Sequence, residues 1–149
     1  MITVRPMRPT DADIWIRMRA TFWPDGSLAE HAGDVSAFFA GSLPQLMAVL
    51  LAEDADGRPI GFAELSIRGY AEGCTSSKVA YLEGWYVVPE MRRQGVGGAL
   101  VRAAEEWGRS QGCTEFASDA EVANQASAAA HQALGFAEAG VVRCFYKPL

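Results

Sequence analysis

The chain has 149 residues, half of them apolar and 21% charged, and its formal net charge is −5. This length allows one domain with a hydrophobic core and is short for two, so a single domain is expected over residues 1–149. The arginines are scattered and no apolar run reaches the length of a membrane span, which argues against a nucleic-acid partner and a membrane protein, whereas acidic charge suits a cationic small molecule.

The first third of the chain predicts one strand and two helices. Residues 2–7 form the strand, and a helix over 9–23 starts at a cap residue, either Thr10 or Asp11. The turn WPDG separates this helix from a second one over 27–41, because proline and glycine both interrupt helices.

The middle of the chain predicts three strands. Those over 45–54 and 60–68 flank a short turn and form a hairpin. A polar loop over 69–78 follows, and loops held by a rigid scaffold often carry function. The next strand, 79–88, is almost continuously apolar, so both of its faces are expected to be covered.

The last third of the chain predicts a helix over 96–108, a strand over 113–119, a helix over 124–136 and a final strand over 140–149. The predicted order is therefore one strand, two helices, three strands, and then a helix, a strand, a helix and a strand. This order predicts an α/β fold, in which a mixed sheet carries helices on both faces.

Residues 92–98, with the sequence RRQGVGG, join the buried strand to a helix N-terminus. The first N–H groups of a helix have no backbone partners and carry partial positive charge, so a pyrophosphate is a natural ligand. Glycines let phosphate oxygens approach the backbone, and the two arginines add positive charge. A tight turn that needs glycine only for its dihedral angles is the alternative, but three glycines favour a phosphate site. The spacing is that of neither a P-loop nor a dinucleotide-binding fold.

This segment resembles the (Arg/Gln)-x-x-Gly-x-(Gly/Ala) motif of the GCN5-related N-acetyltransferases, and the element order is similar to that family along nearly the whole chain. The resemblance implies acetyl-CoA as co-substrate and a sheet splayed between its fourth and fifth strands. The cofactor-binding residues that it implies are Trp85, Tyr86 and Val87 at the acetyl and pantetheine end, Arg93, Gln94, Gly95, Val96, Gly97 and Gly98 at the pyrophosphate, and Asn124, which is also a helix cap.

Glu83 is the only charged residue in the strand over 79–88. A buried carboxylate is unfavourable unless it is paired or protonated, which makes Glu83 a candidate base or cation-binding group. A structural ion pair with an arginine is the alternative. Gly84 beside it predicts a β-bulge or a close approach to the backbone.

Two polar side chains near the end of the chain are further candidates. Asp119 ends the strand over 113–119, where ligands of open sheets bind, although it also suits a helix or turn cap. His131 stands where many of these acetyltransferases have a tyrosine that protonates the leaving thiolate. A structural role for His131 stays open, and Tyr146 is a weaker candidate for the acid.

A closer resemblance, to the aminoglycoside 6'-N-acetyltransferases, extends over the segments FWPDG, SIRGYAEGCTSS, YLEGWYVVP and ASDAEVANQASAAAHQALGF. It implies a homodimer in which the final strand adds to or swaps with a partner's sheet. The substrate-binding residues that it implies are Trp23, Tyr70, Glu83, Asp119 and, in some members, an acidic residue to which Glu138 is the nearest match.

We therefore expect transfer of an acetyl group to the 6'-amine of an aminoglycoside, by direct attack on the thioester and with resistance as the result. Glu83 or Asp119 takes the proton of the amine, and a backbone N–H at the bulge polarises the thioester carbonyl. Carboxylates and aromatic walls suit a polycationic sugar. Two alternatives remain: acetylation of another cationic amine, such as a polyamine, a metabolite or a protein N-terminus, and a non-catalytic acyl-CoA-binding domain.

The cysteines indicate where the protein works. Cys74, Cys113 and Cys144 lie far apart and lack metal-ligand spacing, which argues against a disulfide framework and a zinc site. The first ten residues also lack the apolar region of a signal peptide. The sequence thus predicts a cytoplasmic protein without a metal.

Overall fold

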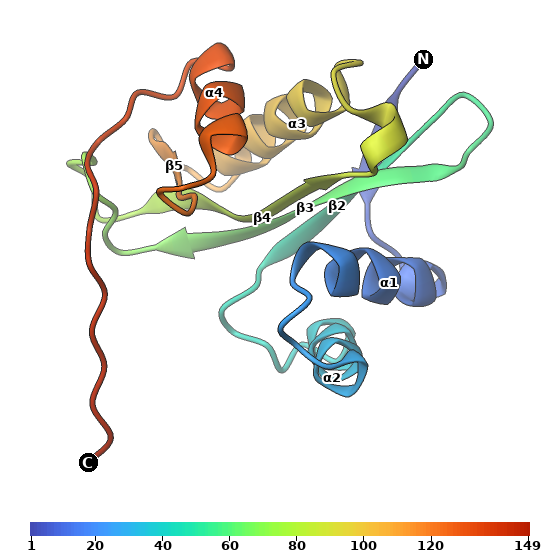
Figure 1. Ribbon diagram of the computed structural model, residues 1–149, viewed down its shortest axis with the longest axis horizontal. Helices are drawn as coiled ribbons and strands as arrows, with labels where there is room; N and C mark the ends of the chain where they lie inside the picture. Colours follow the sequence, from blue (N-terminus) through green and yellow to red (C-terminus); the bar gives the residue numbers. More distant parts are fainter.

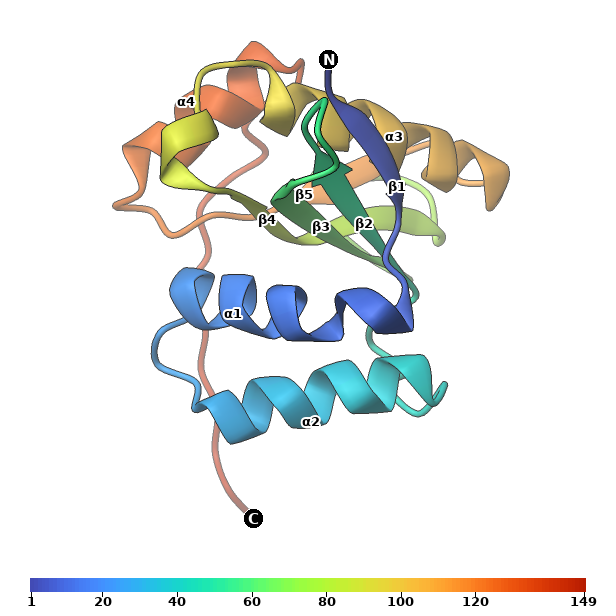
Figure 2. The ribbon, with the colours of Figure 1, turned by 90° about the vertical axis from the view of Figure 1, so that its right-hand side faces the viewer.

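A five-stranded sheet lies between two pairs of helices in the computed structural model, which describes all residues from 1 to 149 (Figures 1 and 2). Helices α1 and α2 cover one face, and α3 and α4 the other, which confirms the predicted α/β fold. None of the helices combines the length and apolar character needed to cross a membrane. The elements are β1 (Thr3–Pro6), a 3-10 turn (Pro9–Asp11), α1 (Ala12–Phe22), α2 (Leu28–Phe39), β2 (Ala48–Glu53), β3 (Pro59–Arg68), β4 (Val79–Val87), a second 3-10 turn (Pro89–Met91), α3 (Val96–Ser110), β5 (Phe116–Ser118) and α4 (Gln125–Ala133).

The strands follow the order β1-β2-β3-β4-β5, and only the last pair is parallel. β4 and β5 pair at three positions, the last being Leu82 with Ser118. β4 continues to Val87, so its second half has no strand on that side. The predicted splay between the fourth and fifth strands is therefore confirmed.

A β-bulge at Glu83 changes the direction in which the side chains of β4 point. Glu64 of β3 pairs with Gly84 and Leu65 pairs with Leu82, so Glu83 is an extra residue. Leu82 and Trp85 both pack against the core under α3, although strict alternation would place them on opposite faces. The bulge predicted beside Gly84 is confirmed.

Each face of the sheet has its own hydrophobic core, because neighbouring residues of a strand point to opposite faces. Leu50 and Ala52 of β2 join the core under α3, together with Leu100 of that helix. Leu51 lies between them in sequence and joins the opposite core, which contains Trp15 of α1. The two cores hold both helical layers onto one sheet.

The predicted final strand over 140–149 is wrong for the single chain. These residues form no strand and are exposed, and Figure 1 shows the chain end running away from the sheet. A strand needs a neighbour that completes its hydrogen bonds, and this segment lies beside no strand of its own chain.

The start of the first helix also differs from the prediction. Residues 9–11 form a 3-10 turn, and Asp11 takes the N-cap position of α1 without accepting a bond from that helix. Its carboxylate instead accepts from the Arg8 N–H at 2.8 Å and from the Arg5 guanidinium. The ion pair with Arg5 and the bond from Arg8 therefore take the place of a cap on α1.

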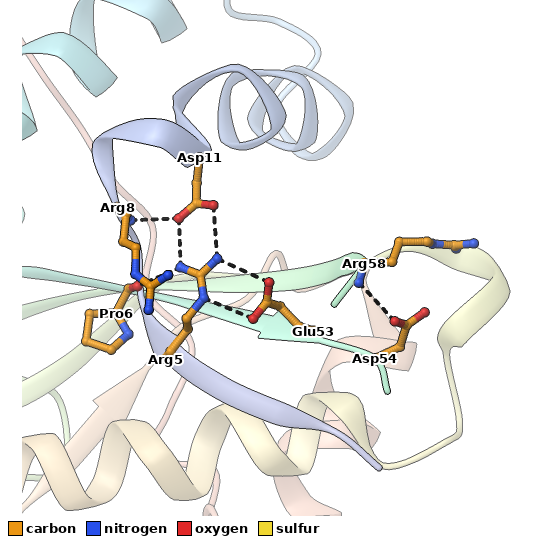
Figure 3. A network of polar contacts seen from close by, with 7 residues as sticks. All are labelled: Arg5, Pro6, Arg8, Asp11, Glu53, Asp54 and Arg58. Atoms are coloured by element: carbon orange, nitrogen blue, oxygen red, sulfur yellow. Dashed lines mark hydrogen bonds and ion pairs between the residues drawn. The ribbon is translucent and has the colours of Figure 1, made fainter. Parts of the chain in front are cut away.

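Arg5 ties the first strand to its neighbours (Figure 3). Its guanidinium donates two hydrogen bonds to Asp11, at 2.8 and 3.0 Å, and two to Glu53 at the end of β2, at 2.9 and 3.1 Å. All three side chains are largely buried. Because the Arg5 guanidinium favours the charged carboxylate, it holds the pKa of Asp11 below its usual value.

Replacing Asp11 with asparagine keeps the side-chain shape and removes the charge that faces Arg5. We expect the free energy of unfolding to fall by about 1–2 kcal/mol at pH 7. The pKa of Asp11 is lower in the folded chain than in the unfolded one, so its stabilisation is present above about pH 4 and is lost as the pH falls further. Urea unfolding should show the difference shrinking towards pH 3, and a difference independent of pH would contradict the ion pair.

Candidate active site

The loop before α3 presents a row of backbone N–H groups that have no acceptor. The six groups from Arg93 to Gly98 donate to nothing in the chain, although those on either side are bonded. Arg93 and Gly95 have left-handed φ values of 60° and 87°, a feature of the backbone nests that bind anions. Arg93 is the only residue other than glycine in that region, and such strain clusters at functional sites. This row of N–H groups is suited to a pyrophosphate.

The three glycines of the loop are needed for different reasons. A Cβ on Gly95 would meet nothing within 4 Å, so its left-handed φ explains the glycine. On Gly97 the Cβ would lie 3.0 Å from the Trp85 ring, and on Gly98 it would lie 3.2 Å from Arg102. Close packing therefore contributes to the choice of glycine at Gly97, whereas the exposed end of the Arg102 side chain can move away from a Cβ on Gly98.

Trp85 connects the gap between β4 and β5 to α3. Its indole Nε1 donates to the Gly97 carbonyl at 3.2 Å. Tyr86 instead points into the opposite core, so its side chain does not reach the gap. The Val88 N–H donates towards β3, and the Val87 carbonyl accepts from Arg92 on the other side. By alternation, the backbone of Val87 and Trp85 faces the gap.

His131 lies where the two strands separate. Its Nδ1 is 2.7 Å from the Ser127 carbonyl, which can only accept, so Nδ1 carries a hydrogen. Its Nε2 is 2.8 Å from the Ser118 hydroxyl, and the ring packs edge-on against Trp85. Asn124 caps α4 by accepting from the Ser127 N–H at 3.0 Å, which confirms the expected helix cap.

A cavity of about 570 Å³ opens on the α1 side of the sheet. Three carboxylates, two guanidiniums and one aromatic ring line it: Asp34, Glu64, Glu83, Arg19, Arg68 and Trp23. Trp23 is seated against the bulge, since a Cβ on Gly84 would lie 2.6 Å from its ring. The close backbone approach predicted at Gly84 is therefore confirmed, together with the bulge.

Glu83 is paired with an arginine, as in the structural alternative considered from the sequence. Its Oε1 accepts from the Ser66 hydroxyl at 2.6 Å and from Arg68 Nε at 2.9 Å, and its Oε2 accepts from Arg68 Nη2 at 2.7 Å. The side chain retains 25% of its exposure, so it is not a fully buried charge. It lies in the cavity with both oxygens occupied.

Asp119 is joined to this group through Tyr81. It follows β5 and caps no helix; its Oδ2 accepts from the Tyr81 hydroxyl at 2.6 Å. Burial and the neighbouring Asp119 raise the pKa of Tyr81, which keeps the phenol protonated. The Arg68 guanidinium stacks on the Tyr81 ring at 3.6 Å, so Asp119 and Glu83 flank one arginine.

Three predicted substrate residues do not line the cavity: Asp119, Tyr70 and Glu138. Tyr70 is exposed in the loop over 69–78. Glu138 is exposed after α4, and its neighbour Ala139 packs against Gly73 of the same loop. The single chain brings Trp23 and Glu83 together and links Asp119 to them, whereas Tyr70 and Glu138 lie in exposed segments.

The sequence analysis missed the most buried carboxylate, Glu64. It accepts two bonds from Arg19 at 2.7 Å and one from the Trp15 indole at 3.2 Å. Burial raises the pKa of Glu64, and Arg19 and Trp15 counteract this by stabilising the ionised form. The rule applied to Glu83 points equally to Glu64, the only charged residue between Ile60 and Ile67.

Comparison with known proteins identifies the family. A family model described as the acetyltransferase (GNAT) family matches residues 13–136. The chain belongs to this family. Its sequence is 57% identical over 146 residues to the aminoglycoside N(6')-acetyltransferase type 1 of Klebsiella aerogenes, which is 98% of this chain and 96% of that one. The protein of the same name from Stenotrophomonas maltophilia is 43% identical, covering 99% and 94% of the two chains.

A solved structure from the GNAT family has the same fold. AAC(6')-Iy in complex with the bisubstrate analogue CoA-S-monomethyl-acetylneamine matches with a TM-score of 0.90 and 37% identity, covering 100% of this chain and 99% of that one. These matches confirm the family and the fold predicted from the glycine loop and the order of the elements.

Replacing Arg19 with methionine would leave the Glu64 carboxylate buried without a counter-ion. We expect the free energy of unfolding to fall by about 3–5 kcal/mol at pH 8, as when one partner of a buried pair is removed. The loss should be smaller at pH 5, because the raised pKa of Glu64 then lets it take up a proton. Urea unfolding at both pH values measures this, and an equal loss at both would contradict an ionised pair.

Proposed function

We propose that this chain is an acetyl-CoA-dependent N-acetyltransferase, formed by one domain over residues 1–149, that acetylates the 6'-amine of aminoglycosides. The observation that carries the proposal is the row of unpartnered N–H groups, from Arg93 to Gly98, next to the gap that separates β4 from β5. An acidic cavity with an aromatic wall lies across β4 from it. The choice of acceptor is supported by the names of the similar proteins.

The acyl donor would bind along the loop and the gap. The N–H groups of Arg93, Gln94, Gly95, Val96, Gly97 and Gly98 would hold the pyrophosphate. The backbone of Trp85 and Val87 would bind the pantetheine amides as a missing strand would, and Asn124 would add a bond from α4. Tyr86 would not contact the donor, because its side chain is in the opposite core and, by alternation, its backbone N–H and C=O face β3.

The acceptor would bind on the other side of β4. Trp23 would provide a flat wall for a sugar ring, and Glu83 and Asp119 would accept hydrogen bonds from ammonium groups. Tyr70 and Glu138 would close the rim of the site. The carboxylates of Glu83, Asp119 and Glu138 would favour a cationic acceptor, and Glu83 would have to exchange its bonds from Arg68 for bonds from the acceptor.

The reaction would be a direct attack of the neutral amine on the thioester carbonyl carbon. The new N–C bond forms as the C–S bond breaks, and Glu83 or Asp119 takes the proton lost by the amine. A backbone N–H at the bulge stabilises the negative charge that develops on the carbonyl oxygen. Ser118 and His131 lie at the separation of the strands, where a proton can pass to the departing thiolate.

Replacing Glu83 with glutamine keeps its shape and removes its charge and basicity. We expect kcat/KM with kanamycin or tobramycin to fall by about 10²-fold, the usual contribution of a general base. A thiol-release assay measures this, with Glu106→Gln on the exposed side of α3 as the control that stays at wild-type activity.

Full activity of the Glu83→Gln variant would remove Glu83 as the base. The same assay, run over polyamines, small metabolic amines and peptide N-termini, tests the acceptor. No turnover of any aminoglycoside by the wild type would contradict the proposed function. Acetyl-CoA binding without turnover of any amine would favour a binding domain, and growth of an expressing bacterium on aminoglycosides measures resistance.

We also propose that the protein forms a homodimer through its chain end and works in the cytoplasm. Val141, Val142, Phe145 and Tyr146 are exposed along an extended segment. β5 pairs with β4 on one edge only, so its other edge offers unpaired backbone groups. The free thiols of Cys74, Cys113 and Cys144 suit a reducing compartment.

Removing residues 140–149, or replacing Phe145 with aspartate, should therefore give a monomer. Sedimentation velocity measures the change, and Val122→Asp is the matched control, because Val122 is also exposed but lies before α4. A dimer that persists in both tail variants would contradict the role of the chain end.

A further inference from the structure

Arg68 lies between the two carboxylates that are proposed to bind the acceptor. It is the last residue of β3, and it donates two hydrogen bonds to Glu83, at 2.9 and 2.7 Å. Its guanidinium carbon lies 3.6 Å from the centre of the Tyr81 ring, whose hydroxyl donates to Asp119. The protein's own cation thus contacts Glu83 directly and is linked to Asp119 through Tyr81.

Both carboxylate oxygens of Glu83 therefore already accept hydrogen bonds before an acceptor ammonium binds. One oxygen of Glu83 accepts from Ser66 and Arg68, and the other accepts from Arg68 again. A second cation placed beside this carboxylate would be repelled by the guanidinium at short range. Binding at Glu83 thus requires Arg68 to move away.

The surroundings of Arg68 allow this movement. Its side chain keeps 43% of its exposure, and pairs of that kind contribute little to stability. Arg19, the other arginine of the cavity, keeps only 9% and is held by Glu64, Asp34 and His31. Arg19 is therefore a fixed part of the cavity wall, whereas the Arg68 side chain can move away from Glu83.

We propose that Arg68 weakens acceptor binding: it is a resident cation that an acceptor ammonium displaces from Glu83, so every acceptor that binds there has to break the Arg68–Glu83 pair. The free energy of breaking this pair is the same for an acceptor with one ammonium and for a polycation. A polycationic acceptor offsets it with further ammonium groups near Asp119 and Asp34, each of which adds a charge-assisted hydrogen bond. This inference rests on the proposed function and names a residue that sets the affinity of its acceptor site.

Two variants of Arg68 separate charge from geometry. Arg68→Met keeps an unbranched stem beside Tyr81 without charge, and Arg68→Lys keeps the charge without the two-bond contact. Calorimetry in the presence of CoA would give the Kd of tobramycin and of 6-amino-6-deoxyglucose, a sugar with one amine. Arg58→Met is the matched control, because Arg58 precedes β3 and forms an exposed ion pair with Glu90 at 2.8 Å.

We expect Arg68→Met to bind the monoamine and tobramycin about three- to fivefold more tightly than the wild type, because the ion pair that both acceptors have to break is removed. Arg68→Lys should show a smaller gain, and Arg58→Met should bind both acceptors as the wild type does. Unchanged or weaker binding of both acceptors by Arg68→Met would overturn the inference. If Arg68→Met does not fold, tighter binding by Arg68→Lys would support the inference, and unchanged or weaker binding would overturn it.

A different result would contradict the proposed function. A wild type that neither binds nor acetylates tobramycin would contradict the function, and the inference with it. A wild type that acetylates tobramycin, combined with unchanged or weaker acceptor binding in Arg68→Met, would contradict only the role of Arg68.

Discussion

The separation of β4 from β5 after Leu82 is the constraint around which the candidate site is arranged. β5 pairs with β4 at only three positions and ends at Ser118, and β4 continues without a neighbour on that side. The unpaired backbone of β4 faces a gap that opens towards the N-terminus of α3. The bulge at Glu83 occurs at the same point and turns one carboxylate to the α1 side. One irregular strand therefore borders both the proposed donor side and the proposed acceptor side.

The two arginines of the acceptor cavity differ in what surrounds them. Arg19 and Glu64 form a buried pair, enclosed by Trp15 and the α1 layer, and such a pair is strongly destabilised when one partner is removed. Arg68 and Glu83 form a half-exposed pair at the end of β3, which solvent and ligands can reach. Burial thus distinguishes the Arg19–Glu64 pair from the Arg68–Glu83 pair. In the sequence the two glutamates look alike, because each is the only acidic residue of an apolar strand.

Local patterns predicted most of the elements. Residues close together in the chain determine most of the strands and helices, the loop over 69–78 and the cap at Asn124. These features could therefore be predicted from the sequence. The strand expected over 140–149 failed because a strand exists only beside another strand, and these residues join no strand of the sheet. The cap at Asp11 failed because Arg5 competes for its carboxylate, and no local pattern reveals that contact.

The sequence by itself determined the family, the donor loop and the residue types of the site, because a row of free N–H groups needs only a strand, three glycines and a helix start. The tertiary structure decided how these residues are used. It showed that Gly97 also packs against Trp85, that Glu64 is the buried carboxylate and that Arg68 joins Glu83 to Tyr81 and Asp119. These relations join β3, β4, β5 and α3, and a contact between residues distant in sequence is defined only once the chain has folded.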